Sequence, residues 1–99
     1  MPVNETRNER IHIWVTGRVQ GVGFRAYVVD QARRLGLSGW VRNVGWNEVE
    51  TVAEGKRRQL EIFLDLVHAG PQGSRVEETR SEWEEAGDEF TRFEINYGH

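Results

Sequence analysis

The chain has 99 residues, a formal net charge of −3 at pH 7, and 37% hydrophobic, 10% aromatic and 29% charged residues. This composition suffices for one hydrophobic core and argues against disorder. The net acidity argues against a nucleic-acid partner, and no apolar run approaches the ~20 residues of a membrane span. With no cysteine, disulfides and thiol chemistry are excluded. We expect a flexible, polar leader over residues 1–9 and a single cytoplasmic domain over residues 10–99, without a membrane partner.

The first part of the chain predicts a strand followed by a helix. Residues 10–17 alternate between apolar and polar side chains, which is typical of a strand with one buried face. From residue 24 onward, apolar side chains recur every three or four residues, and Gly36 stands where a helix would end. This spacing predicts an amphipathic helix of about three turns. The apolar positions are Ile11, Ile13 and Val15 in the strand, and Phe24, Val28, Ala32 and Leu35 in the helix.

The middle of the chain predicts a hairpin and a second helix. Strands at 38–44 and from residue 48 flank a turn near Gly45-Trp46-Asn47, where Gly and Asn both tolerate positive φ. The second helix opens with Lys56-Arg57-Arg58, interpreted as a solvated face, and stops at Gly70-Pro71. Its apolar stripe consists of Leu60, Phe63, Leu64 and Val67.

The last third predicts two more strands. Residues 74–85 form a polar strand whose acidic run favours a charged sheet edge over a metal patch, and residues 90–97 alternate again. Phe93, Ile95 and Tyr97 fall on one face of that last strand. The predicted elements follow the order βαββαβ with an extra C-terminal strand. This order predicts an α+β, ferredoxin-like sandwich with an antiparallel sheet and two helices on one face. This fold alone does not decide function.

The segment GRVQGVGFR, residues 17–25, connects the first strand to the first helix. A helix N-terminus presents unpaired N–H groups and the positive end of the helix dipole, and glycines let the preceding loop curl around an anion such as phosphate. Arg25 in the first turn disfavours the helix slightly unless an anion binds there. The alternative is a loop that only turns the chain, and the spacing by itself leaves both interpretations open.

The same segment, GRVQGVGFR, is similar to the signature of the acylphosphatases. GWVRNVGWNEVETVAEG, residues 39–55, resembles that family's second signature, and the tail also resembles the family, so the resemblance covers about residues 10–97. It implies a ferredoxin-like fold and hydrolysis of the carboxyl-phosphate bond of a small-molecule acyl phosphate to carboxylate and inorganic phosphate. It also implies no metal and no organic cofactor. At this size we expect a monomer.

The resemblance assigns roles to particular residues. Arg25, at the end of the first motif, corresponds to the catalytic arginine, and Asn43 corresponds to the catalytic asparagine. The backbone that would bind the phosphate, or a sulfate anion in its place, belongs to Gln20, Gly21, Val22, Gly23 and Phe24. N–H groups and a guanidinium suit the charge of a phosphoryl transition state, and an amide can orient water without acting as a base. We hypothesise that the substrate's own phosphate oxygens accept the water's proton.

Two other functions compete with this one. A binding module of the same fold could hold a phosphate-bearing ligand or nucleic acid without hydrolysis, but Arg25 together with Asn43 favours the enzyme, because an anion binder needs no oriented water. A domain of a larger hydrogenase maturation factor that processes carbamoyl phosphate is disfavoured by the chain length.

Asn47 replaces the family's usual turn glycine, and we expect it to keep a left-handed conformation. We expect Trp46 in this turn to be exposed and the other tryptophans to pack in the core or at its rim. The histidines are scattered along the chain, so we expect them to bind no metal.

Overall fold

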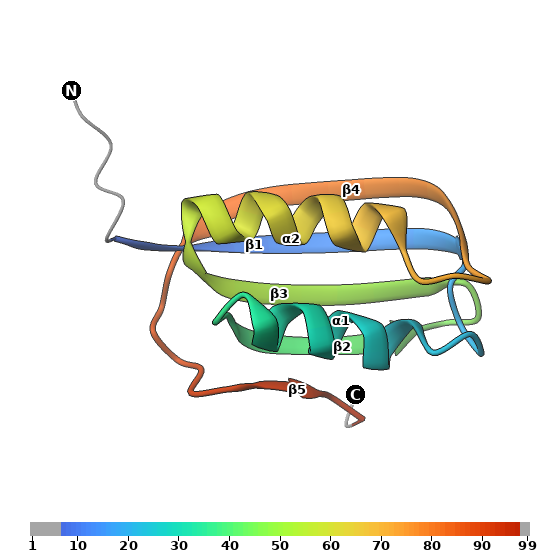
Figure 1. The fold of residues 1–99 in the computed structure, drawn as a ribbon, viewed down its shortest axis with the longest axis horizontal. Helices are drawn as coiled ribbons and strands as arrows, with labels where there is room; N and C mark the ends of the chain where they lie inside the picture. The colour runs from blue at the N-terminus through green and yellow to red at the C-terminus, as the bar shows by residue number, and fades with distance from the viewer. Residues whose placement is uncertain (1–6, 98–99) are drawn as a thin grey trace.

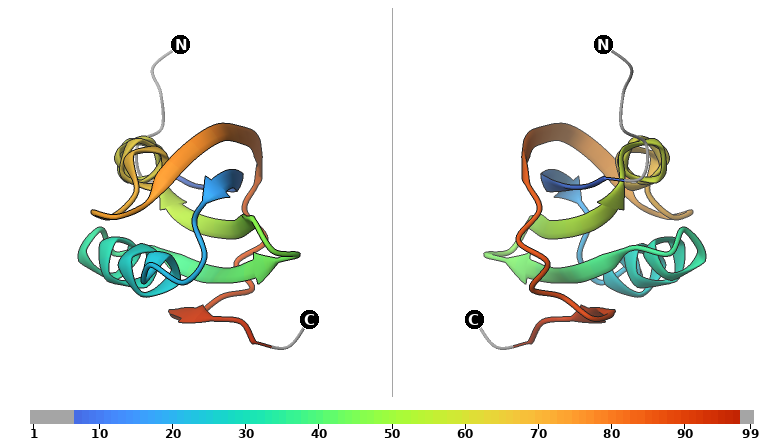
Figure 2. Two further views of the ribbon diagram at one scale, coloured as in Figure 1. Left: turned by 90° about the vertical axis from the view of Figure 1, so that its right-hand side faces the viewer. Right: turned by 90° about the vertical axis from the view of Figure 1, so that its left-hand side faces the viewer.

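The computed structural model describes residues 7–97 of the chain, and its elements follow the predicted order. They are β1 (Asn8–Arg18), α1 (Phe24–Arg34), β2 (Ser38–Val44), β3 (Glu48–Lys56), α2 (Arg57–Ala69), β4 (Arg75–Glu85) and β5 (Phe93–Ile95). The five strands form one sheet in the order β4-β1-β3-β2-β5. Both helices cover the same face of this sheet, as Figure 1 and the end views of Figure 2 show. The ferredoxin-like α+β sandwich is therefore confirmed.

The sheet is mixed rather than wholly antiparallel, which corrects one part of the expectation. β1 pairs antiparallel with β3 and β4, and β2 with β3, but β5 runs parallel to β2. The chain leaves β4 at one end of the sheet and crosses to the opposite edge at that same end (Figure 1). β5 must therefore run opposite to β4, which is the direction of β2. It spans only residues 93–95 of the predicted 90–97, because it pairs only with Gly39, Trp40 and Val41.

The N-terminal boundary of the domain differs slightly from the prediction. Asn8 and Glu9 pair with Lys56 and Gly55 of β3, so β1 begins inside the segment expected to be a flexible leader. The rest of that prediction concerns residues 1–6, which lie outside the described residues. Within residues 7–97, no helix has the length and apolar character that crossing a membrane requires.

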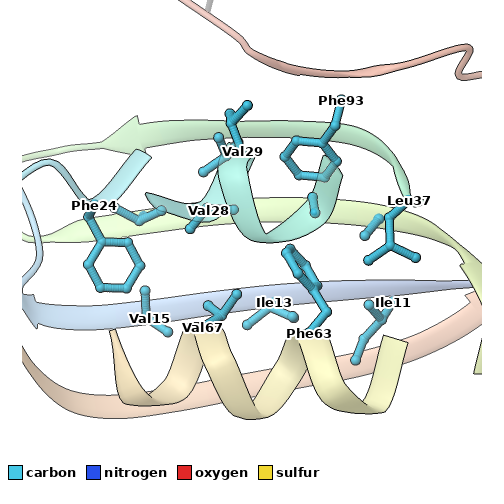
Figure 3. Close-up of a cluster of buried hydrophobic side chains, with 14 of the residues drawn as sticks. Ile11, Ile13, Val15, Phe24, Val28, Val29, Leu37, Phe63, Val67 and Phe93 are labelled. Carbon is cyan, nitrogen blue, oxygen red and sulfur yellow. The ribbon is translucent and has the colours of Figure 1, made fainter. Parts of the chain in front are cut away.

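The hydrophobic core fills the space between the sheet and the two helices (Figure 3). Because the side chains of β1 alternate, Ile11, Ile13 and Val15 are completely buried. The apolar faces of the two helices pack against these side chains. Phe63 of α2 and Phe93 of β5 pack edge to face with ring centroids 5.8 Å apart, which ties the last strand to the core. Burial of each such side chain stabilises the fold by about 1.5–3 kcal/mol. The predicted positions that are fully or almost fully buried are Ile11, Ile13, Val15, Phe24, Val28, Ala32, Leu60, Phe63 and Val67, whereas Leu35 and Leu64 are only partly buried.

The opposite face of the sheet carries paired charges. Glu50 of β3 is 8% exposed. Its carboxylate accepts hydrogen bonds from Arg42 Nε at 2.7 Å and from His12 Nε2 at 2.6 Å. Burial alone would raise the pKa of Glu50, but these two partners hold it below its ordinary value. Glu54, 3% exposed, is paired with Arg10 at 2.6 Å. These contacts satisfy carboxylates that would otherwise be costly to bury.

The tryptophans and the predicted turn take specific places. Trp83 packs against the core, while Trp14 stacks on His12 on the open face with ring centroids 3.8 Å apart. Residues 45–47 form the predicted turn between β2 and β3. The left-handed position is Gly45, with φ 59°, and not Asn47, because Asp88 is the only non-glycine residue with positive φ in the described part. The backbone carbonyl of Asn47 instead accepts a hydrogen bond from the Gly17 N–H at 3.0 Å.

Candidate active site

The loop between β1 and α1 ends in a helix N-terminus with free donors. Gly23 is the N-cap residue, with φ 76° and ψ 21°, and no side chain caps the helix. This left-handed conformation explains why a glycine stands there. The first helical hydrogen bond runs from the Tyr27 N–H to the Gly23 carbonyl at 3.0 Å. The N–H groups of residues 24–26 therefore precede the intrahelical ladder, and the first turn holds no acid. This end of α1 is suited to an anion.

A cavity of about 250 Å³ lies against this loop and contains both predicted catalytic side chains. Arg25 comes from the first turn of α1, and Asn43 comes from β2, on the same side of that strand as the buried Val41. The loop contributes Val19, Gln20, Gly21 and Gly23 to the cavity, and α1 contributes Phe24. Val22 is not among them, because its side chain packs against the core. The tertiary structure thus brings together residues from two segments about twenty positions apart.

Asn43 lines this cavity and, in the described part of the chain, carries an acceptor atom without a partner. Its Oδ1 atom is buried and has no hydrogen-bond partner among residues 7–97. A buried amide oxygen without a partner is uncommon in folded proteins, since leaving one unsatisfied costs about 1–3 kcal/mol. An amide oxygen accepts hydrogen bonds and cannot donate one.

Arg25 is partly buried and stacks on an aromatic ring. Its guanidinium carbon lies 5.3 Å from the ring centroid of Tyr97, which follows β5 and is 75% exposed. The ion pairs of the described chain do not include Arg25, so its charge is not neutralised by a carboxylate there. The guanidinium is therefore oriented by a ring that leaves its N–H donors available to an anion.

Gln20 has a role that the sequence did not predict, because only its backbone was assigned to the site. Its side-chain Nε2 donates to three carbonyl oxygens of the β2–β3 hairpin: Val44 at 3.3 Å, Gly45 at 3.1 Å and Glu48 at 3.0 Å. This side chain joins the glycine-containing loop to the strand that carries Asn43. No local signal could have identified it, because the partners lie more than twenty residues away.

Ile95 and Tyr97 were also missed as cavity residues. The alternation in residues 93–97 correctly placed them on one face with Phe93. Only the parallel pairing of β5 with β2 shows that this face leads to Arg25 and Asn43.

The other titratable candidates lie elsewhere. His12 contacts Glu50 on the open face, and His68 Nδ1 lies 2.7 Å from Thr79 Oγ1. His99 lies outside the described residues. The acidic run lies on the edge strand β4, where Glu84 faces Arg10 at 3.8 Å. Within residues 7–97, no three side chains of the types His, Asp and Glu are grouped as metal ligands would be.

The chain is similar to known proteins over most of its length. The sequence model of one family, Acylphosphatase, matches residues 11–95. An acylphosphatase of Anaeromyxobacter sp. (strain Fw109-5) is 44% identical over 88 residues, which are 89% of this chain and 95% of that protein. One from Salinibacter ruber is 45% identical over 92% of this chain and 97% of its own length. The crystal structure of acylphosphatase from Bacillus subtilis shares the fold with a TM-score of 0.86 and 37% identity, covering 90% of this chain and 99% of that one.

Proposed function

The chain belongs to the acylphosphatase family and is an enzyme that hydrolyses acyl phosphates, and on this premise we propose that Arg25, Asn43 and the loop before α1 carry the reaction. The observation that supports this most directly is that Asn43, whose buried Oδ1 has no partner within residues 7–97, lines the same cavity as Arg25. A cation, an amide and a helix N-terminus around one small cavity can position and stabilise a phosphoryl group during hydrolysis.

The phosphoryl group binds at the N-terminus of α1. The backbone N–H groups of residues 20–24 surround it, and the guanidinium of Arg25 pairs with its oxygens. The Tyr97 ring holds that guanidinium in place, so less conformational freedom is lost on binding. Inorganic phosphate, the product, and sulfate carry the same arrangement of anionic oxygens and bind the same groups.

Asn43 orients the attacking water. Its Oδ1 accepts one hydrogen bond from the water, which directs a lone pair of the water oxygen toward phosphorus. The new P–O bond forms as the bond between phosphorus and the carboxyl oxygen breaks, and the acyl carboxylate leaves with that electron pair. The transition state is loose and its charge lies on the equatorial oxygens, where Arg25 and the N–H groups stabilise it.

The proton of the water passes to a phosphate oxygen of the substrate. One acyl phosphate and one water give one carboxylate and one dihydrogen phosphate, so atoms and charge balance. The residues that line the cavity support this route, because they include no histidine and no carboxylate. A carboxylate leaving group needs no general acid, since it is a weak base.

The test is phosphate release from benzoyl phosphate in the presence of EDTA. We expect Arg25→Ala to lower kcat/KM by about a thousandfold, because an ion pair at ~4 Å is worth about 4 kcal/mol at an effective dielectric of 20. Asn43→Ala is expected to lower kcat by about a hundredfold to a thousandfold, as the loss of one oriented polar group does in other active sites.

Matched controls separate these roles from general damage. Arg34→Ala removes an exposed arginine of the same helix, and Asn8→Ala an exposed asparagine at the start of β1; both should retain activity. Circular dichroism of each variant checks the fold. Full activity of folded Arg25→Ala or Asn43→Ala protein would reject the assignment of that residue, and a required histidine would reject the proton route.

The enzyme acts as a cytoplasmic monomer in this proposal. The long edge strand β4 exposes charged side chains along its length, among them Arg75, Glu78 and Arg80, and charged side chains on an edge oppose pairing with a second copy. Sedimentation velocity should give a single species near 11.5 kDa. A stable dimer at assay concentrations would contradict this.

A further inference from the structure

A second cavity adjoins the first at the same end of the molecule. It has a volume of about 360 Å³ and shares Val19 and Gln20 with the cavity that contains Arg25 and Asn43. Its other walls come from the end of β1, the β2–β3 turn and the start of β4. In Figure 1 the loop before α1 and the β2–β3 turn lie together at this end. The two cavities therefore adjoin each other at Val19 and Gln20.

Trp46 stands at this second cavity with most of its surface in solvent. It is 82% exposed, and the only other large hydrophobic side chains exposed in the described part are Tyr97, at 75%, and Ile62, at 43%. Trp46 and Tyr97 each line one of the two adjoining cavities. A turn with a left-handed Gly45 does not require an indole at the next position, so the fold does not explain this tryptophan. Exposed aromatic side chains gathered around a cavity are typical of a binding surface.

We propose that the second cavity is a subsite for the acyl group of the substrate and that Trp46 packs against the apolar body of that group. This rests on the proposed function, which places the phosphoryl group at the N-terminus of α1. The acyl group then passes over Gln20, whose amide nitrogen is engaged with hairpin carbonyls and does not compete for substrate.

The charges around the subsite indicate which acyl groups fit. Arg18 and Glu77 both line it, so their opposite charges give no net preference for a charged group. The indole offers a flat apolar surface. The subsite therefore selects acyl phosphates with an aromatic or extended apolar acyl group over small ones such as acetyl phosphate.

The experiment compares kcat/KM for benzoyl phosphate and acetyl phosphate in the wild type, Trp46→Ala and Trp46→Gln. Both variants should lose about threefold to tenfold in kcat/KM for benzoyl phosphate, the range measured for contacts between aromatic rings, while acetyl phosphate changes less than about twofold. Trp46→Phe should recover part of the preference. Ile62→Ala, an exposed apolar residue of α2, is the control and should leave both substrates unchanged.

Each other outcome has a defined meaning. An equal loss for both substrates in folded Trp46 variants would overturn the subsite, because it would show that the turn only supports the site. A loss of selectivity in Tyr97→Ala but not in Trp46→Ala would also overturn it and would place the acyl group beside Ile95 and Tyr97. No hydrolysis of either substrate by the wild type would instead reject the proposed function itself.

Discussion

The side-chain nitrogen of Gln20 donates to the carbonyl oxygen of Glu48 at 3.0 Å, and so joins the loop before α1 to the first residue of β3. The same nitrogen also donates to Val44 and Gly45, directly after Asn43. One side chain therefore sets the spacing between the proposed phosphate-binding loop and the proposed water-orienting amide. The effects of losing the Gln20 side chain on activity and on stability can be measured separately.

Gln20→Leu removes the donor and leaves the hairpin carbonyls without this partner. We expect the free energy of unfolding to fall by about 1–3 kcal/mol. We expect kcat to fall by about a hundredfold, because a shift of about 1 Å between catalytic groups has that effect. Urea denaturation and steady-state kinetics measure the two quantities. Gln72→Leu, at an exposed position in the loop before β4, is the control. Unchanged kcat in a destabilised Gln20→Leu protein would assign the residue a structural role only.

Inorganic phosphate should stabilise the enzyme through the same site. A ligand that binds only the folded state adds about 1.4 kcal/mol at ten times its Kd. Thermal unfolding in phosphate and in chloride at equal ionic strength measures this gain. We expect Arg25→Ala to lose it and Arg34→Ala to keep it. An equal gain in both variants would show that phosphate acts on the protein surface in general.

The lowered pKa of Glu50 makes stability depend on pH in acid. Burial opposes ionisation of Glu50, but hydrogen bonds from His12 and Arg42 outweigh it, so the folded state holds the carboxylate more strongly than the unfolded chain does. Above the ordinary pKa of 4.5 this contribution is fully present. It decreases as the pH falls below that value, because the unfolded chain takes up the proton first.

Glu50→Gln tests this contribution. The variant keeps the shape of the side chain and removes its charge, so we expect it to be less stable by about 1–3 kcal/mol at neutral pH. The difference from the wild type should narrow between about pH 5 and about pH 2. Urea denaturation across this range measures both curves. A constant difference would show that the charge of Glu50 does not contribute.

Gly39 should tolerate no side chain. Its φ is 145°, and an added Cβ would collide with the carbonyl oxygen of Val52 on the neighbouring strand. Gly73→Ala is a suitable control, because its φ of 91° is also unfavourable for alanine but a Cβ there meets nothing within 4 Å. We expect Gly39→Ala to destabilise the protein by about 2 kcal/mol more than Gly73→Ala, measured by urea denaturation. Equal effects would show that β2 shifts to accommodate the methyl group.

Local patterns were enough to predict the seven elements and their order. Ile11, Ile13 and Val15 alternate because a strand turns successive side chains to opposite faces, and Leu60 and Phe63 share a helical face for an equally local reason. The motif around Arg25 likewise indicated a helix N-terminus. By contrast, the antiparallel direction expected for β5 and the left-handed conformation expected for Asn47 were wrong, and within the turn only Gly45 has a positive φ.

The sequence by itself determined the elements, the apolar faces that drive them together, and the resemblance from which Arg25 and Asn43 were chosen. Only the tertiary structure decided that these two side chains share a cavity, that Gln20 joins its walls, and that Tyr97 supports the guanidinium of Arg25. The physical reason is the range of the interactions. Periodicity and turn chemistry act within a few residues, whereas these contacts join segments that strand pairing and core packing bring together across the whole chain.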